Sequence, residues 1–266
     1  MPDLADLRTI LAPNPGLMTG PGTNQYLVGD VLIDVAMWDE ENARRLRAGL
    51  GDGSLRTIAL THVHPDHVGG ARGLREDSGA PIAVHRSRAA AAPGGRPLAP
   101  DQLLDDGTEI EHAGGTLRAV HTPGHESGHC CYYDPARRWL FTGDLILGMG
   151  TTIVAPPDGD MTAYLASLRR LLELDLVCLL PGHGPPIERP YDKITEYLEH
   201  RLLRERQILA ALRAGTTEIP ALVERIYVEL HPGLRFAAAL TVRAHLDKLM
   251  REGAVREEPA ETFRLA

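Results

Sequence analysis

The segment Thr61–His67, with the sequence THVHPDH, restricts this chain more than any other. It follows the apolar run Leu55–Leu60, which is typical of a buried β-strand. Three histidines and one aspartate crowd six positions, and core packing does not produce this density because a buried imidazole or carboxylate must find a partner. The first two histidines can point to one side of the backbone, while the aspartate and the third histidine follow a proline and can point toward a second position. The segment therefore predicts a site for two metal ions at a strand end.

The composition indicates one large α/β domain, or one such domain with a small appendage. The chain has 266 residues, of which 43% are hydrophobic, enough to form a proper core. Cys130, Cys131 and Cys178 are too few for a disulfide framework or a cysteine-ligated zinc, so we expect packing residues and a reducing compartment. The amino end lacks the pattern of a signal peptide, and no apolar run approaches the length of a membrane span. We therefore expect a soluble, cytoplasmic protein.

The distribution of charge divides the chain. The formal net charge is −8, which argues against broad nonspecific binding of polyanions. From residue 191 to the end there are 12 Lys and Arg against 12 Asp and Glu, whereas the first 190 residues have 16 against 24. This change predicts a domain boundary near Pro190, with a catalytic domain at residues 1–190 and a second domain at residues 191–266.

Apolar patterns and turn residues predict alternating strands and helices before that boundary. We expect strands at residues 7–11, 26–28, 31–35, 55–60, 81–84, 108–112, 116–121, 129–133, 139–142 and 176–180. We expect helices at residues 40–50, 68–76 and 161–174, a functional loop at 12–24 and an exposed linker at 89–100. Beyond the boundary, helices at residues 192–213, 218–230 and 236–253 and a terminal hairpin predict a winged-helix arrangement.

Three later strands also end in residues of the type that bind metals. The ends are Thr122–His125, Gly143–Asp144 and Pro181–Gly184. Each of these motifs alone is usually a turn or a plain strand end, but together they repeat one pattern, a strand followed by a ligand. The predicted metal ligands are His62, His64, Asp66, His67, His125, Asp144 and His183.

Imidazoles and carboxylates in this combination suit zinc and tolerate iron or manganese. We assign His62, His64 and His125 to one metal and Asp66, His67 and His183 to the other, with Asp144 bridging the two. Two such metals share a hydroxide at neutral pH, and their net positive charge attracts anionic substrates. Asp66 is the candidate catalytic residue, because it can handle the proton of the leaving group.

The remaining acidic and histidine candidates have weaker support. Asp34 is either a plain acid at a strand end or a partner that orients a metal-binding histidine. His121 and His129 lie close to His125 in the sequence, so the same two alternatives hold for them. We expect surface or core histidines at positions 85, 112, 200, 231 and 245.

The four strand-end motifs resemble those of the metallo-β-lactamase superfamily over roughly the first 190 residues. The resemblance implies an αββα sandwich with a binuclear metal site at one edge. The segments Pro21–Val28, Leu145–Thr152 and His200–Leu209 resemble the β-lactamase-like protein 2 branch, which extends the similarity over nearly the whole chain. That branch has a small winged-helix-like domain at its carboxyl end, and it includes an endoribonuclease acting on single-stranded RNA and fungal thioesterases of acyl carriers.

Departures from neighbouring families narrow the expected activity. True lactamases of this fold commonly have cysteine at the position of Asp144, which argues against penicillin hydrolysis. Flavodiiron proteins have glutamate at the position of His64, so zinc is favoured over a redox iron pair. Glyoxalase II ends in a different helical domain, and the 38 residues between Asp144 and His183 leave no room for the insertion of β-CASP nucleases.

The leading functional hypothesis is a binuclear zinc hydrolase that cleaves phosphodiesters of single-stranded RNA. Arginines of the tail would guide the RNA backbone, among them those at positions 201, 204, 206, 243 and 251. The alternative is hydrolysis of a thioester or another activated acyl compound, as in glyoxalase II or acyl-carrier thioesterases. A third hypothesis is a nucleic-acid-binding sensor with a vestigial metal site. The sequence is silent on oligomeric state and leaves a homodimer open.

Overall fold

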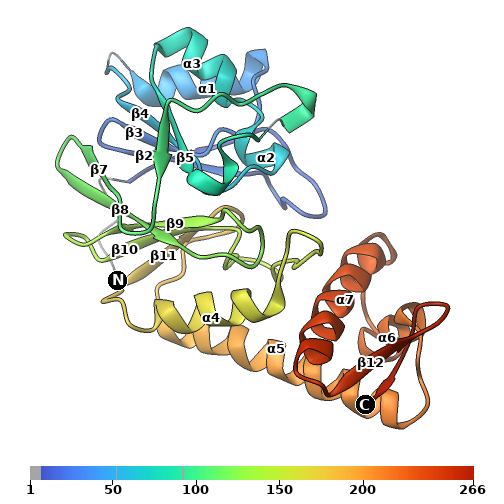
Figure 1. Cartoon of the computed structure of the whole chain (residues 1–266). Coiled ribbons are helices and arrows are strands. Elements are labelled where there is room, and N and C mark those ends of the chain that lie inside the picture. Colours follow the sequence, from blue (N-terminus) through green and yellow to red (C-terminus); the bar gives the residue numbers. More distant parts are fainter. Residues whose placement is uncertain (1–6, 52, 92) are drawn as a thin grey trace. The chain divides into compact units, whose positions relative to one another are not determined.

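The structure, a computed structural model, describes residues 7–51, 53–91 and 93–266 (Figure 1). The chain divides into two compact units. The first comprises residues 1–122, 128–150 and 174–191, and the second comprises residues 123–127, 151–173 and 192–266. The predicted domain boundary at residue 190 stays a prediction.

The first unit contains a six-stranded sheet in simple sequence order. Its strands are β1 (Arg8–Leu11), β2 (Asn24–Val28), β3 (Val31–Ile33), β4 (Thr57–Ala59), β5 (Ile82–His85) and β6 (Gln102–Leu104). The pairs β1–β2 and β2–β3 are antiparallel, and β3 to β6 are parallel. Parallel strands end at the same edge of a sheet, so the residues after β3 and β4 come together.

A five-stranded sheet with the order β11-β10-β9-β8-β7 packs against the first sheet. Its strands are β7 (Glu109–His112), β8 (Gly115–His121), β9 (Cys130–Asp134), β10 (Trp139–Gly143) and β11 (Cys178–Pro181). Tyr26 and Ile33 from one sheet and Tyr132 and Phe141 from the other belong to the same buried cluster. The strands β10 and β11 are parallel, so this sheet also brings two strand ends to one edge.

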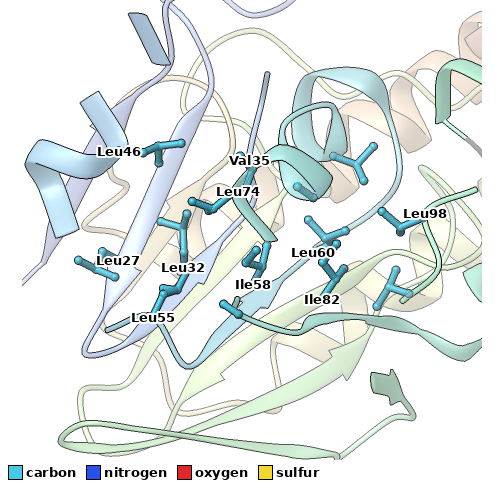
Figure 2. Packing of buried hydrophobic residues seen from close by; sticks show 14 of the residues in the cluster. Leu27, Leu32, Val35, Leu46, Leu55, Ile58, Leu60, Leu74, Ile82 and Leu98 are labelled. Carbon is cyan, nitrogen blue, oxygen red and sulfur yellow. The ribbon is translucent and has the colours of Figure 1, made fainter. Parts of the chain in front are cut away.

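Helices cover the outer face of the first sheet (Figure 1). These are α1 (Glu40–Leu50) and α3 (Ala71–Ser78), and the short α2 (Pro65–Val68) precedes α3. Figure 2 shows Leu46 of α1 and Leu74 of α3 among Leu32, Ile58 and other side chains of the sheet. Successive residues of a strand point to opposite faces, and β3 follows this rule because Leu32 faces the helices whereas its neighbours face the second sheet.

The second unit is mainly helical. Its helices are α4 (Met161–Leu171), α5 (Pro190–Arg213, which begins in the first unit), α6 (Ile219–Ile226) and α7 (Arg235–Arg251). The strands β12 (Val255–Glu258) and β13 (Thr262–Leu265) form an antiparallel hairpin after α7. Side chains from the end of α5, α6, α7 and the hairpin share one buried cluster that includes Phe263. This is the arrangement of helices and hairpin that the sequence predicts for a winged helix.

The α/β class and most elements agree with the sequence-based prediction, and two details do not. Residues 89–100 were expected to be an exposed linker, but Leu98 is buried, and the three-residue edge strand β6 that follows was not predicted. One helix was expected at residues 68–76, but the structure has α2 and α3 with Gly69 and Gly70 between them. No helix in the described part of the chain has both the length and the apolar character needed to cross a membrane.

Candidate metal centre

Three strand ends of the first unit supply six of the seven predicted ligands. His62 and His64 follow β4, Asp66 and His67 lie on α2, Asp144 follows β10 and His183 follows β11. Pro65 occupies the first position of α2, where its missing N–H costs no hydrogen bond. Its fixed φ starts the turn that separates the first two histidines from the next two ligands.

Four candidate ligands, from α2 and from the residues that follow β10 and β11, lie close together. The Nε2 atom of His67 lies 3.3 Å from Nε2 of His183, 3.2 Å from Oδ1 of Asp144 and 3.9 Å from Oδ2 of Asp66. The Nε2 atom of His183 lies 3.3 Å from the Asp66 oxygen and 3.4 Å from the Asp144 oxygen. Each carboxylate therefore lies close to both imidazoles.

This donor set fits a divalent metal. Metal–ligand bonds of about 2.0–2.2 Å in a tetrahedral site place the ligand atoms about 3.3–3.6 Å apart, and four of the five distances here lie within about 0.1 Å of that range. Two imidazoles and two carboxylates suit zinc and also iron or manganese. We conclude that His67, His183, Asp66 and Asp144 have the chemistry and spacing of a metal site.

Asp34 orients His67 from behind. Its Oδ2 atom accepts a hydrogen bond from Nδ1 of His67 at 2.7 Å, so Nδ1 carries the proton and Nε2 is the ligand atom. The Asp34 carboxylate also accepts from the backbone N–H and the hydroxyl of Thr61, each at 2.8 Å. The sequence left two roles open for Asp34, and the structure shows the second, a partner of a candidate ligand.

His62 also belongs to the cluster. His62, His67 and Asp144 each offer a ligand atom, and these atoms lie within 4.8 Å of one another. The ring centroids of His62 and His64 are 4.7 Å apart. The Nε2 atom of His129 accepts from the backbone N–H of Asp144 at 3.2 Å, which fixes the start of the β10 loop. His129 therefore supports a candidate ligand.

Two glycines of the motifs leave room for the cluster. A Cβ atom on Gly182 would lie 2.6 Å from Cε1 of His67 and 2.8 Å from Oδ1 of Asp144. Gly143 has a φ of +47°, and a Cβ atom there would lie 2.7 Å from the Thr61 side chain. A side chain at position 182 would displace two candidate ligands, and one at position 143 would displace Thr61.

The charges of the cluster shift its protonation. Burial alone would lower the pKa of His67, but the Asp144 and Asp34 carboxylates outweigh burial and raise that pKa well above its ordinary value. Burial would raise the pKa of Asp66, yet the hydrogen bond to His183 and the positive charge of His67 bring that pKa below its ordinary value. The side chain of Asp66 is 30% exposed, whereas those of His67 and His183 are 0% and 2% exposed. Asp66 is thus the most exposed of these four side chains, and its surroundings favour the ionised carboxylate.

His125 lies in the second unit, in the segment Pro123–Ser127. Its Nδ1 atom is 2.7 Å from the carbonyl of Ile153, which can only accept, so Nδ1 carries the proton and Nε2 is left with a lone pair. The division of the seven predicted ligands between two metals stays a prediction.

The loop between β1 and β2 is ordered and attached to His183. The side chain of Asn24 donates to the carbonyls of Pro181 and Gly184, and the Gly22 carbonyl lies 3.4 Å from Nδ1 of His183. Leu17 and Met18 in this loop are 61% and 51% exposed. The sequence indicated a functional loop here but did not reveal that Asn24 ties it to the site.

The other histidines have structural places. His121 stacks on His85 with centroids 3.9 Å apart, and His231 begins a short 3-10 helix at Pro232–Leu234. Burial and the nearby Arg201 lower the pKa of His245 to about 3 and that of His200 to about 4. All three cysteines are buried and none of them forms a disulfide, as expected of packing residues.

Comparisons with known proteins agree with this geometry. The family profile of the metallo-beta-lactamase superfamily matches residues 18–183, and that of the beta-lactamase associated winged helix domain matches residues 219–262. The chain is 33% identical to a beta-lactamase-like protein 2 homolog of Caenorhabditis elegans, with 96% of this chain and 88% of that protein covered.

Two further relatives extend the comparison. The chain is 31% identical to an atrochrysone carboxyl ACP thioesterase of a Cryptosporiopsis species, with 96% of this chain and 76% of that protein covered. A metallo-beta-lactamase family protein of Thermus thermophilus has a similar crystal structure, with a TM-score of 0.82, 27% identity and 99% of both chains covered. The predicted fold, an αββα sandwich followed by a winged helix, is confirmed by these matches.

Proposed function

Because the chain belongs to the metallo-β-lactamase superfamily, in the branch of the β-lactamase-like protein 2 homologues, we propose that this hydrolase uses two zinc ions to cleave thioesters of an acyl carrier. The observation that carries the proposal is that one carboxylate oxygen of Asp66 and one of Asp144 each lie within 3.2–3.9 Å of Nε2 of both His67 and His183, and these two Nε2 atoms are 3.3 Å apart. When bound, a zinc pair supplies an activated water and stabilises developing negative charge. A cytoplasmic location and a homodimer belong to the same proposal.

Under this proposal, His62, His64 and His125 hold the first zinc ion. Covalent connection supports the inclusion of His125. The backbone N–H of Thr122 donates to the carbonyl of His129 at 2.9 Å, which closes the intervening loop at its base. His129 lies beside His62, with ring centroids 5.3 Å apart. His125 is therefore only four residues along the chain from His129, which lies beside a candidate ligand.

Asp66 is the residue that moves a proton. Its carboxylate stays ionised at neutral pH in spite of partial burial, because the hydrogen bond to His183 and the charge of His67 keep its pKa below the ordinary value, and it is the most exposed of the four side chains. It accepts a proton from the attacking water as the bond from oxygen to the acyl carbon forms. It then gives that proton to the sulfur as the carbon–sulfur bond breaks, so a carboxylic acid and a thiol result.

The arginines of the second unit favour a thioester over RNA. Arg243 is paired with Asp247 and Glu257, and Arg251 is paired with Asp160. Arg201 is buried with 1% of its surface exposed, and Arg204 lies over the ring of Tyr227. Four of the five arginines predicted to guide RNA are therefore engaged within their own unit. A relative that is named a thioesterase of an acyl carrier supports the same choice.

A direct assay tests the proposal. Zinc-loaded protein and its Asp66→Ala and Asp66→Asn variants are incubated with a panel of acyl thioesters and with labelled single-stranded RNA. We expect thioester turnover that falls by about 10²–10⁴-fold in both variants. RNA cleavage lost with Asp66, without thioester turnover, would replace this proposal with a nuclease. Binding of either ligand without turnover would favour a sensor.

A further inference from the structure

A buried arginine of the second unit has no acidic partner among the described residues. Arg201 lies on α5 with 1% of its surface exposed, and it is the largest fully buried side chain of the described residues. No carboxylate of the described residues forms an ion pair with Arg201. Burying a guanidinium costs on the order of several kcal/mol unless its donors and its charge are satisfied. The contacts that Arg201 does make therefore indicate its role.

The first contact of Arg201 fixes the backbone that holds His125. Its Nη2 atom donates to the carbonyl of Thr152. The next carbonyl along the chain, that of Ile153, accepts from Nδ1 of His125 at 2.7 Å. The following N–H, that of Val154, faces the hydroxyl of Thr241 on α7 at 3.5 Å. The acceptor for His125 thus lies between two anchors, one from α5 and one from α7.

The second contact of Arg201 supports the loop that carries His125. The guanidinium lies over the ring of Tyr164, 5.1 Å from its centroid. The backbone of Tyr164 packs so closely on Gly124 that a Cβ atom there would lie 2.3 Å from the Tyr164 Cα atom. The Gly124 carbonyl also accepts from the backbone N–H of Asp160 at 2.8 Å. The Ile153 carbonyl and Tyr164 both support the segment around His125. Arg201 bonds the chain next to the first and lies over the ring of the second.

We propose that Arg201 is a positioning residue for His125. It holds the Ile153 carbonyl where that group accepts the Nδ1 proton, and this hydrogen bond fixes the tautomer in which Nε2 is free of a proton and can bind a metal. The inference rests on the proposed function, because it takes His125 as a ligand of the first zinc ion. It gives α5 a part in metal binding that is separate from any contact with substrate.

The test measures metal affinity and does not depend on turnover. Zinc affinity of each of the two sites is measured by competition with a chelator, and metal content is measured after dialysis at fixed free zinc. The variants are Arg201→Met, which keeps the apolar stem, Arg201→Lys, which keeps the charge, and Thr241→Val, which keeps the shape. The matched control is Arg204→Met, because Arg204 lies three residues along α5 and contacts Tyr227, Gln207 and the Ile226 carbonyl, outside the His125 loop.

We expect Arg201→Met to weaken one zinc site by about 10–100-fold and to leave the other unchanged. Arg201→Lys should weaken it less, and Arg204→Met should leave both affinities unchanged even if it lowers the melting temperature. If Arg201→Met does not fold, Thr241→Val must weaken the same site. Unchanged affinities in the folded Arg201 variants, with one site lost in His125→Ala, would overturn the positioning role alone. Two intact sites in His125→Ala would instead overturn the ligand assignment of the proposed function.

Discussion

Asp34 shows how one carboxylate organises a ligand without touching the substrate. It is 2% exposed, has a φ of +61° and accepts three hydrogen bonds, two from Thr61 and one from His67. Aspartate tolerates this backbone conformation better than most residues because its short side chain can hydrogen-bond locally. The carboxylate therefore sets both the ring orientation and the tautomer of His67.

Removing this carboxylate should weaken metal binding. We expect Asp34→Ala to lower zinc affinity by about 10–100-fold, because His67 loses the partner that fixes its tautomer. Asp34→Asn should lose less, since an amide oxygen can still accept from Nδ1. Competition with a chelator gives both values, and an affinity equal to that of the unchanged protein would contradict the role. Asp30, whose side chain pairs with the exposed Arg56 away from the site, provides the control Asp30→Asn.

The loop between β1 and β2 joins two exposed apolar side chains to the strand end that carries His183. Asn24 at its base bonds the carbonyls on both sides of Gly182–His183. Gly20 within the loop approaches Met149 so closely that a Cβ atom would lie 2.3 Å from its sulfur. Leu17 and Met18 are therefore exposed on a loop that these contacts hold in place. Exposed apolar side chains of this kind suit an acyl chain.

Making the loop polar should affect long acyl chains selectively. We expect the double variant Leu17→Ser and Met18→Ser to raise KM for long-chain thioesters by about tenfold or more, with little effect on short chains, because each apolar side chain that no longer covers the acyl chain weakens binding by about 1 kcal/mol. Steady-state kinetics over a series of chain lengths checks this. Val228→Ser is a suitable comparison, because Val228 is 82% exposed in the second unit. An equal loss for short and long chains would argue against an acyl contact.

The sequence predicted the elements and candidate ligands that depend on local patterns. Strand ends followed by histidine or aspartate indicated which side chains lie in the cluster, and Asp39 predicted the start of α1, where it accepts from Asn42. The strand β6 was missed because Gln102–Leu104 is too short for a pattern. The roles of Asn24 and Arg201 depend on carbonyls 157 and 49 residues away, which no local pattern reveals.

The second unit carries a stability that depends on pH. His245 is fully buried, 4.0 Å from Glu205 and near Arg201, Arg204, His200 and Lys248. Burial and these cations lower its pKa from 6.5 to about 3, so the folded protein excludes a proton that the unfolded chain binds. The contribution of neutral His245 is therefore complete above pH 6.5 and is lost as the pH falls toward 3.

Acid should destabilise the protein through this residue. Between pH 7 and pH 4 we expect His245 to account for a loss of about 2–3 kcal/mol in the free energy of unfolding. Urea unfolding at several pH values measures it. His245→Leu should make the pH dependence shallower, whereas His231→Gln, a change at an exposed position, should not. Parallel curves for His245→Leu and the unchanged protein would exclude this origin.

The hydrogen bonds from Asn24 to Pro181 and Gly184 have a consequence for biosynthesis. A ribosome must translate β11 before the amino-terminal loop finds its acceptors, so a nascent chain of about 150 residues has His62, His64 and Asp66 but not the fourth strand end. Contacts between distant segments form late in folding. The candidate ligands therefore come together only after most of the polypeptide has been made, and incomplete chains lack part of the cluster.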